Sequence, residues 1–126
     1  MDKKLLLFFE KKPAALPLYH VFEQKVLRQT ENVCIRIQTT QITFSNRHVF
    51  ACVSFLPIQK AKKRPDPYIV ISFGLPRRET SPRIDGATEP YPGRWTHHIL
   101  IARPEDIDTQ VMAWIKEAAA FAAAKR

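Results

Sequence analysis

The chain has few cysteines and glycines and no long apolar run, and these absences exclude several kinds of protein. A helix that crosses a bilayer needs about 20 mostly apolar residues. The apolar run near the N-terminus covers only residues 5–9 and is followed by Glu10, Lys11 and Lys12. It is also shorter than the core of a signal peptide. We therefore expect a cytoplasmic domain with no membrane partner.

The two cysteines, Cys34 and Cys52, match no zinc-binding or thioredoxin-like spacing. Both lie in apolar segments typical of strands, which predicts buried free thiols in a reducing compartment. A disulfide between neighbouring strands is the alternative.

Motifs that carry chemistry are also missing. The sequence has no glycine-rich loop that could cradle a phosphate and no G-x-S-x-G elbow. No set of Cys, His, Asp and Glu has the spacing of a metal site. The sequence therefore predicts no catalytic residue, no metal and no cofactor, and whether the protein is an enzyme stays open.

Positive charge is in excess. Twenty Lys and Arg residues stand against twelve Asp and Glu, a formal net charge of +8 over 126 residues. A basic balance favours nucleic acid, anionic membranes or acidic partners. The length and a hydrophobic content of 45% fit one globular domain over residues 1–126.

Hydrophobic periodicity predicts helices, then strands, then a helix. Leu18, Phe22 and Val26 recur every four residues and give one N-terminal helix a core-facing stripe. Residues 49–56 and 68–73 are nearly all apolar, which is typical of strands buried on both faces. The expected parts are a helical part over about 2–29, a sheet over about 32–102 and a helix over about 104–124 that begins at Pro104.

Short strands joined by tight turns favour an antiparallel sheet. We therefore expect an α+β fold, with four to five antiparallel strands and with the N-terminal helices and the C-terminal helix packed on one face. Residues 74–93 hold several prolines and all three glycines. This segment is predicted to be a long loop or to carry one irregular edge strand.

Three strings carry a resemblance to a known family: TQITFSNRHVFA at residues 40–51, EPYPGRWTHHI at 89–99 and PEDID at 104–108. Together they resemble an uncharacterised bacterial family, the domain of unknown function 5655, over nearly the whole chain. That family has no established activity, so the resemblance implies a bacterial cytoplasmic protein. The resemblance also implies related domains fused to nuclease-like or other uncharacterised modules, which favours a connection to nucleic acid. The chain departs from the expected pattern at Thr39, where a lysine is expected, and at Arg103, where a capping Ser or Asp is expected.

The adjacent histidines His97 and His98 are the most unusual pair in the chain. Successive side chains of a strand point to opposite faces, so without a bulge the two cannot serve one pocket or one metal. We expect one to bond with backbone at the edge of the core and the other to face the open side of the sheet. A hydrogen-bonded structural pair is one interpretation, and a neutral general base or ligand near pH 7 is the other.

The candidate binding residues lie in two groups. Polar residues share one face of the predicted strand that begins at Gln41. The first group could form a binding face if Trp95 and His98 lie across from these polar residues. A solvated sheet face also explains them. The members of the first group are Gln41, Arg47, His48, Arg94, Trp95, His97 and His98. The second group would form a basic rim that holds phosphates by charge, or would be simply solvated. Its members are Lys60, Lys62, Lys63, Arg64, Arg77 and Arg78.

We therefore expect a non-catalytic binding module for nucleic acid or another phosphate-bearing ligand. One alternative is a small-molecule enzyme or sensor, with His97 or His98 as base and with Arg47 or Arg94 holding an anion. The other is a protein-interaction module, which would present an apolar patch.

Overall fold

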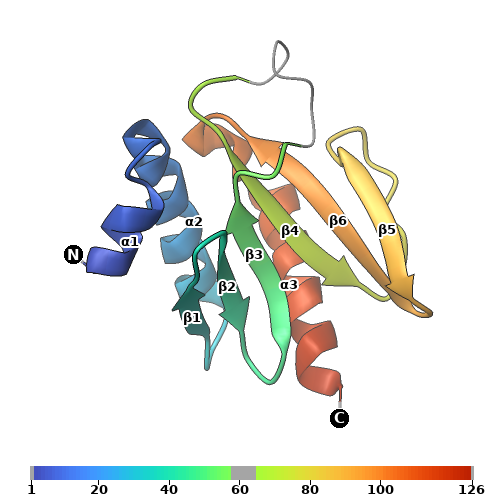
Figure 1. Cartoon of the computed structure of the whole chain (residues 1–126). Helices are drawn as coiled ribbons and strands as arrows, with labels where there is room; N and C mark the ends of the chain where they lie inside the picture. The colour runs from blue at the N-terminus through green and yellow to red at the C-terminus, as the bar shows by residue number, and fades with distance from the viewer. Residues whose placement is uncertain (1, 58–64, 126) are drawn as a thin grey trace.

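The computed structural model describes residues 2–57 and 65–125 (Figure 1). It is α+β, with one antiparallel sheet and helices from both ends of the chain, as predicted; the sheet has six strands rather than four or five. The helices are α1 (Lys3–Phe8), α2 (Leu16–Gln29) and α3 (Thr109–Ala124). The strands are β1 (Cys34–Ile37), β2 (Gln41–Ser45), β3 (Val49–Ser54), β4 (Ile69–Leu75), β5 (Gly86–Tyr91) and β6 (Arg94–Ile101).

The N-terminal helices begin where the sequence provides caps and prolines. The carboxylate of Asp2 accepts a hydrogen bond from the Lys4 amide at 2.7 Å and caps α1. A 3-10 turn at Pro13–Ala15 leads into α2, which begins two residues before Leu18, the first residue of the predicted core-facing stripe. Pro17 is accommodated because an N–H group in the first turn of a helix has no acceptor within the helix, so its absence in proline costs no helical hydrogen bond.

The strand order is β1-β2-β3-β4-β6-β5, so β1 and β5 are the two edges of the sheet (Figure 1). All five pairings are antiparallel. The edge strand expected within residues 74–93 is β5, which pairs with β6. Gly93 has φ +84° in the tight turn between them, a backbone conformation that glycine adopts without strain.

The helices α2 and α3 pack on the same face of the sheet (Figure 1). Trp114 of α3 stacks on Phe73 of β4 with ring centroids 5.8 Å apart, and Phe22 of α2 meets Phe44 of β2 edge-on at 5.2 Å. We call the opposite face the open face, because no helix packs over its central strands in the described part of the chain. The prediction that β3 is buried on both faces is therefore wrong: its open-face side chains Cys52 and Ser54 are only half-buried.

The C-terminal helix begins five residues later than predicted. Pro104–Asp106 form a separate 3-10 turn, and α3 starts at Thr109. The reason is Asp108, whose carboxylate caps the helix by accepting from the Val111 amide at 3.1 Å. Arg83 holds the same carboxylate through both of its oxygens at 2.7 Å. Neither α3 nor any other described helix is long and apolar enough to cross a membrane.

His97 is the one histidine that the core encloses among the described residues. Its Nε2 accepts a hydrogen bond from the Glu79 amide at 2.9 Å, and its ring stacks on Phe73 at 5.3 Å. Burial lowers the pKa of His97 because the charged form would lose its hydration. The neutral imidazole is therefore part of the packed core.

This burial predicts a stability that decreases in mild acid. A histidine with a lowered native pKa takes up its proton more readily in the unfolded chain, so stability is fully present above the unfolded value of about 6.5 and is lost as the pH falls below it. We expect the free energy of unfolding to fall between pH 7 and 5, and to fall less in His97→Leu. Denaturant unfolding at several pH values measures how steeply the free energy of unfolding changes with pH in each protein. Identical pH dependence in the two proteins would contradict the burial of a neutral His97 in the core.

Candidate functional site

A row of three polar side chains crosses the centre of the open face. Cys52 of β3 lies opposite Ser72 of β4, and Ser72 lies opposite His98 of β6. Since alternate residues of a strand share a face, these three point away from the helices while Phe73 and His97 point toward them. Strand pairing thus brings together residues that are far apart in the sequence.

Ser72 and His98 form the most direct contact in this row. The Ser72 hydroxyl lies 2.6 Å from Nδ1 of His98, and Ser72 is only 7% exposed. Burial lowers the pKa of His98, which favours a neutral ring. When the hydroxyl donates to Nδ1, the ring carries its proton on Nε2, and no described residue bonds that N–H. The pair can then offer one further donor to a ligand.

Cys52 keeps its proton in this setting. Burial raises the pKa of the Cys52 thiol, although Ser72 and the charge of Arg94 act in the opposite direction. Both cysteines are free, but the prediction that both are buried is wrong. Cys34 is exposed on the edge strand β1, and Cys52 is half-buried.

Arg94 lies flat on the sheet beside this row. Its Nη1 donates to the Thr96 hydroxyl at 2.7 Å. Its guanidinium occupies the space above Gly74, where a Cβ atom would come within 2.7 Å of Nη2. Among residues 2–57 and 65–125, Arg94 makes no ion pair. The glycine therefore makes room for a positioned cation that has no carboxylate partner in the described chain.

Two adjoining hollows give access to these groups. A hollow of about 600 Å³ is lined by Ser72, Thr96 and His98, with Gln41 on its rim. A smaller one of about 60 Å³ contains Arg94 and shares Cys52, Ser72 and Thr96 with the first. The shared residues show that both open on the same face. Binding pockets for small molecules have volumes in the range of the larger hollow.

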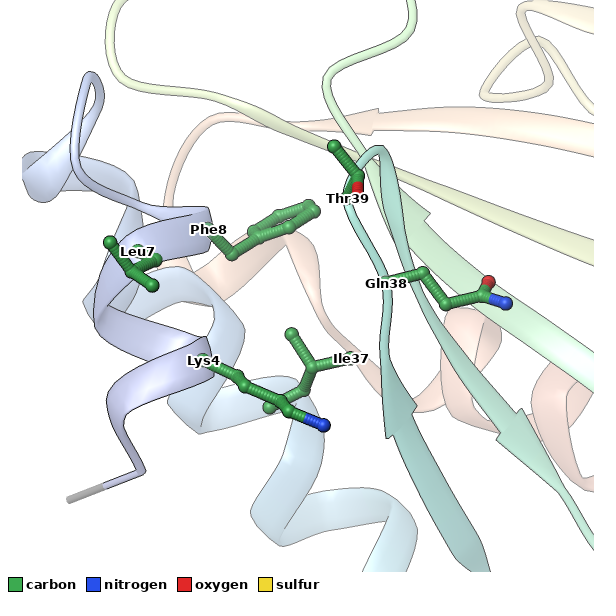
Figure 2. A pocket seen from close by; sticks show the side chains of 6 residues that line it. All are labelled: Lys4, Leu7, Phe8, Ile37, Gln38 and Thr39. Carbon is green, nitrogen blue, oxygen red and sulfur yellow. The ribbon is translucent and has the colours of Figure 1, made fainter.

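A third hollow lies between α1 and the turn from β1 to β2 (Figure 2). It has a volume of about 400 Å³, and Lys4, Leu7 and Ile37 are among its lining residues. Figure 2 shows the Phe8 ring directed from α1 toward Thr39, and these two residues also line the 600 Å³ hollow. None of the predicted site residues lines this third hollow, so we place the candidate site on the open face.

The structure separates the other predicted binding residues from the row. Trp95 and His97 share the face that the helices cover, so Trp95 does not lie beside His98 as the binding interpretation required. The two histidines face opposite ways, as predicted, and the structure decides which is which: His98 faces the open side, while His97 bonds with backbone in the core. Arg47 and His48 lie in the exposed turn between β2 and β3 and are not bonded to the row.

The basic rim is not assembled by the described residues. Arg77 is paired with Glu79 and with Glu117, the latter at 2.7 Å, so its charge is offset. Arg78 lies over the Trp95 ring at 5.5 Å. The remaining members, Lys60, Lys62, Lys63 and Arg64, lie outside the described residues.

Sequence reasoning missed three residues of the site: Cys52, Ser72 and Thr96. A usable signal was nevertheless present in β4, where Ser72 and Gly74 interrupt an apolar strand at alternate positions. Small residues at alternate positions of such a strand indicate that another group closely approaches the face that they share.

The donors of this site suit an anion. The Arg94 guanidinium, the Thr96 hydroxyl and the Nε2–H of His98 can each donate a hydrogen bond, and oxyanions accept them. No group of three or more His, Cys, Asp or Glu side chains in the described chain could hold a metal ion.

Comparison with known proteins supports the family resemblance. The model of a family described as a domain of unknown function (DUF5655) matches residues 7–122, which include the end of α1, from Leu7, and nearly all of α3. No curated protein and no solved structure matched the chain. Because the match covers nearly all of the sequence, the chain belongs to the DUF5655 family.

Proposed function

We propose that this domain binds a small phosphate-bearing ligand on the open face of its sheet. The observation that carries the proposal is Arg94, a guanidinium held over Gly74 and bonded to Thr96, with no acidic partner among the described residues. An arginine that is already held in one position loses little further conformational entropy when an anion binds, so binding needs little reorganisation.

The neighbouring groups fit a phosphate. A phosphate presents several acceptor oxygens, and charge-assisted hydrogen bonds to them are stronger than neutral ones. Ser72 and Thr96 line both hollows, so they connect the guanidinium in the smaller hollow with His98 in the larger one. The net charge of +8 also favours the approach of anions from solution.

The arrangement favours a small ligand over a nucleic acid strand. Nonspecific binding of single strands uses aromatic side chains on which successive bases stack. Tyr68 is buried and donates its hydroxyl to the Phe55 carbonyl, and Trp95 lies on the helix-covered side. Arg77 is already paired with two glutamates. Tyr68 and Trp95 are therefore not placed to stack bases beside the anion site.

Replacing Arg94 tests the site directly. We expect titration with inorganic phosphate to shift the backbone amide resonances of Gly74, Thr96 and His98, and Arg94→Ala to weaken binding about tenfold or more, as expected for the loss of hydrogen bonds to a charged group. The control is Arg28→Ala, which removes the same charge from an exposed site on α2. An equal loss in both variants, or shifts confined to other residues, would refute the proposal.

Gly74→Ala tests position rather than charge. The added Cβ would lie within 2.7 Å of the guanidinium, so Arg94 must leave its place while keeping its charge. We expect phosphate affinity to fall nearly as far as in Arg94→Ala. The matched control is Gly86→Ala, whose Cβ would meet only the His98 ring at an ordinary 3.8 Å. Unchanged affinity in a folded Gly74→Ala protein would show that the guanidinium position does not matter.

A further inference from the structure

We infer that the ligand of this site is an elongated amphipathic anion, with its charged group at Arg94 and an alkyl or acyl chain that runs along the open face. The inference rests on the proposed anion site and adds the chemical class of the rest of the ligand. It follows from which residues line the far end of the 600 Å³ hollow.

The far end of the hollow is an apolar wall formed by Phe8, Phe55 and Leu56. Phe8 stacks on Phe55 with centroids 5.4 Å apart and planes at 23°, so two rings from distant parts of the chain form one surface. Leu56 is 43% exposed beside these rings, so it adds accessible apolar surface to the wall. In Figure 2 the Phe8 ring points toward Thr39, which also lines this hollow, while Leu7 points away.

The strand register sets the distance between the two ends. The guanidinium of Arg94 lies over Gly74 of β4, and Ser54, which immediately precedes the wall residues, pairs with Val70 of the same strand. Four residues of an extended strand span roughly 13 Å. Between these ends lies the polar row with Ser72 and His98.

This span selects for the length of the ligand. Inorganic phosphate can occupy only the Arg94 end, and a butyl chain attached to it ends over the polar row. A chain of roughly ten bonds, each about 1.5 Å long, reaches the apolar wall. The free energy of burying apolar groups then favours the longer chain, by about fourfold in affinity for each methylene that is fully buried.

The test compares inorganic phosphate, butyl phosphate and decyl phosphate by calorimetric titration of the full chain, below the concentration at which the last forms micelles. We expect similar affinities for the first two and at least about tenfold tighter binding of decyl phosphate. Leu56→Ser should remove most of this gain and leave the affinity for inorganic phosphate unchanged. Phe8→Ala should do the same, and Leu56→Ser remains informative if Phe8→Ala fails to fold.

Leu7→Ala is the matched control, because Leu7 is 66% exposed on the same helix and does not line the 600 Å³ hollow. Equal affinities for all three phosphates would overturn this inference and leave the anion site standing. Binding of decyl phosphate that survives both Leu56→Ser and Arg94→Ala would be nonspecific and would also overturn it. Failure of every phosphate to bind would refute the anion site itself.

Discussion

In the described part of the chain, helices pack over one face of the sheet only, and the positions of the candidate site residues follow from that asymmetry. The helices α2 and α3 bury one set of alternate residues, such as Phe44 and Phe73, in a continuous core. The side chains of the other set do not pack against α2 or α3, so they can be polar. In β6 the result is a pair of neighbouring histidines in different environments, with His97 inside the core and His98 on the open face.

The open face carries a glycine inside one of its strands, and this glycine lowers the stability of the sheet. A glycine inside a strand weakens the sheet and contributes no side chain to packing. Gly74 nevertheless lies in the most buried strand, and the space that it leaves is filled by the guanidinium of Arg94. The described chain offers this guanidinium a hydroxyl but no carboxylate. The space that the guanidinium takes requires a glycine at this position, and in the proposed function an anion from solution supplies the missing charge.

Local pattern was sufficient to predict much of the fold. The alternation along strands predicted that His97 and His98 would face opposite ways, and the apolar stripe that begins at Leu18 predicted the packing of α2. The start of α3 was misplaced because Pro104 and Asp108 are both good first residues, and the capping bond to Val111 decides between them. The edge strand β5 was uncertain because prolines and glycines surround it.

The site itself could not be predicted in the same way, because it depends on pairing between distant strands. Ser72 and His98 are 26 positions apart and meet only through the β4–β6 register. The apolar character of β3 also hid the fact that Cys52 faces outward. For Trp95, local pattern does not decide which set of alternate β6 residues enters the core, and the structure shows that His97 rather than His98 shares its face.

The most direct test of the anion site is a crystal structure of the protein soaked in tungstate, a heavy analogue of phosphate whose anomalous scattering locates it without ambiguity. We expect a tungstate ion on the open face, within hydrogen-bonding distance of the Arg94 guanidinium and the Thr96 hydroxyl. An open face without the ion, together with Arg94 turned away from Gly74 onto a carboxylate, would contradict it.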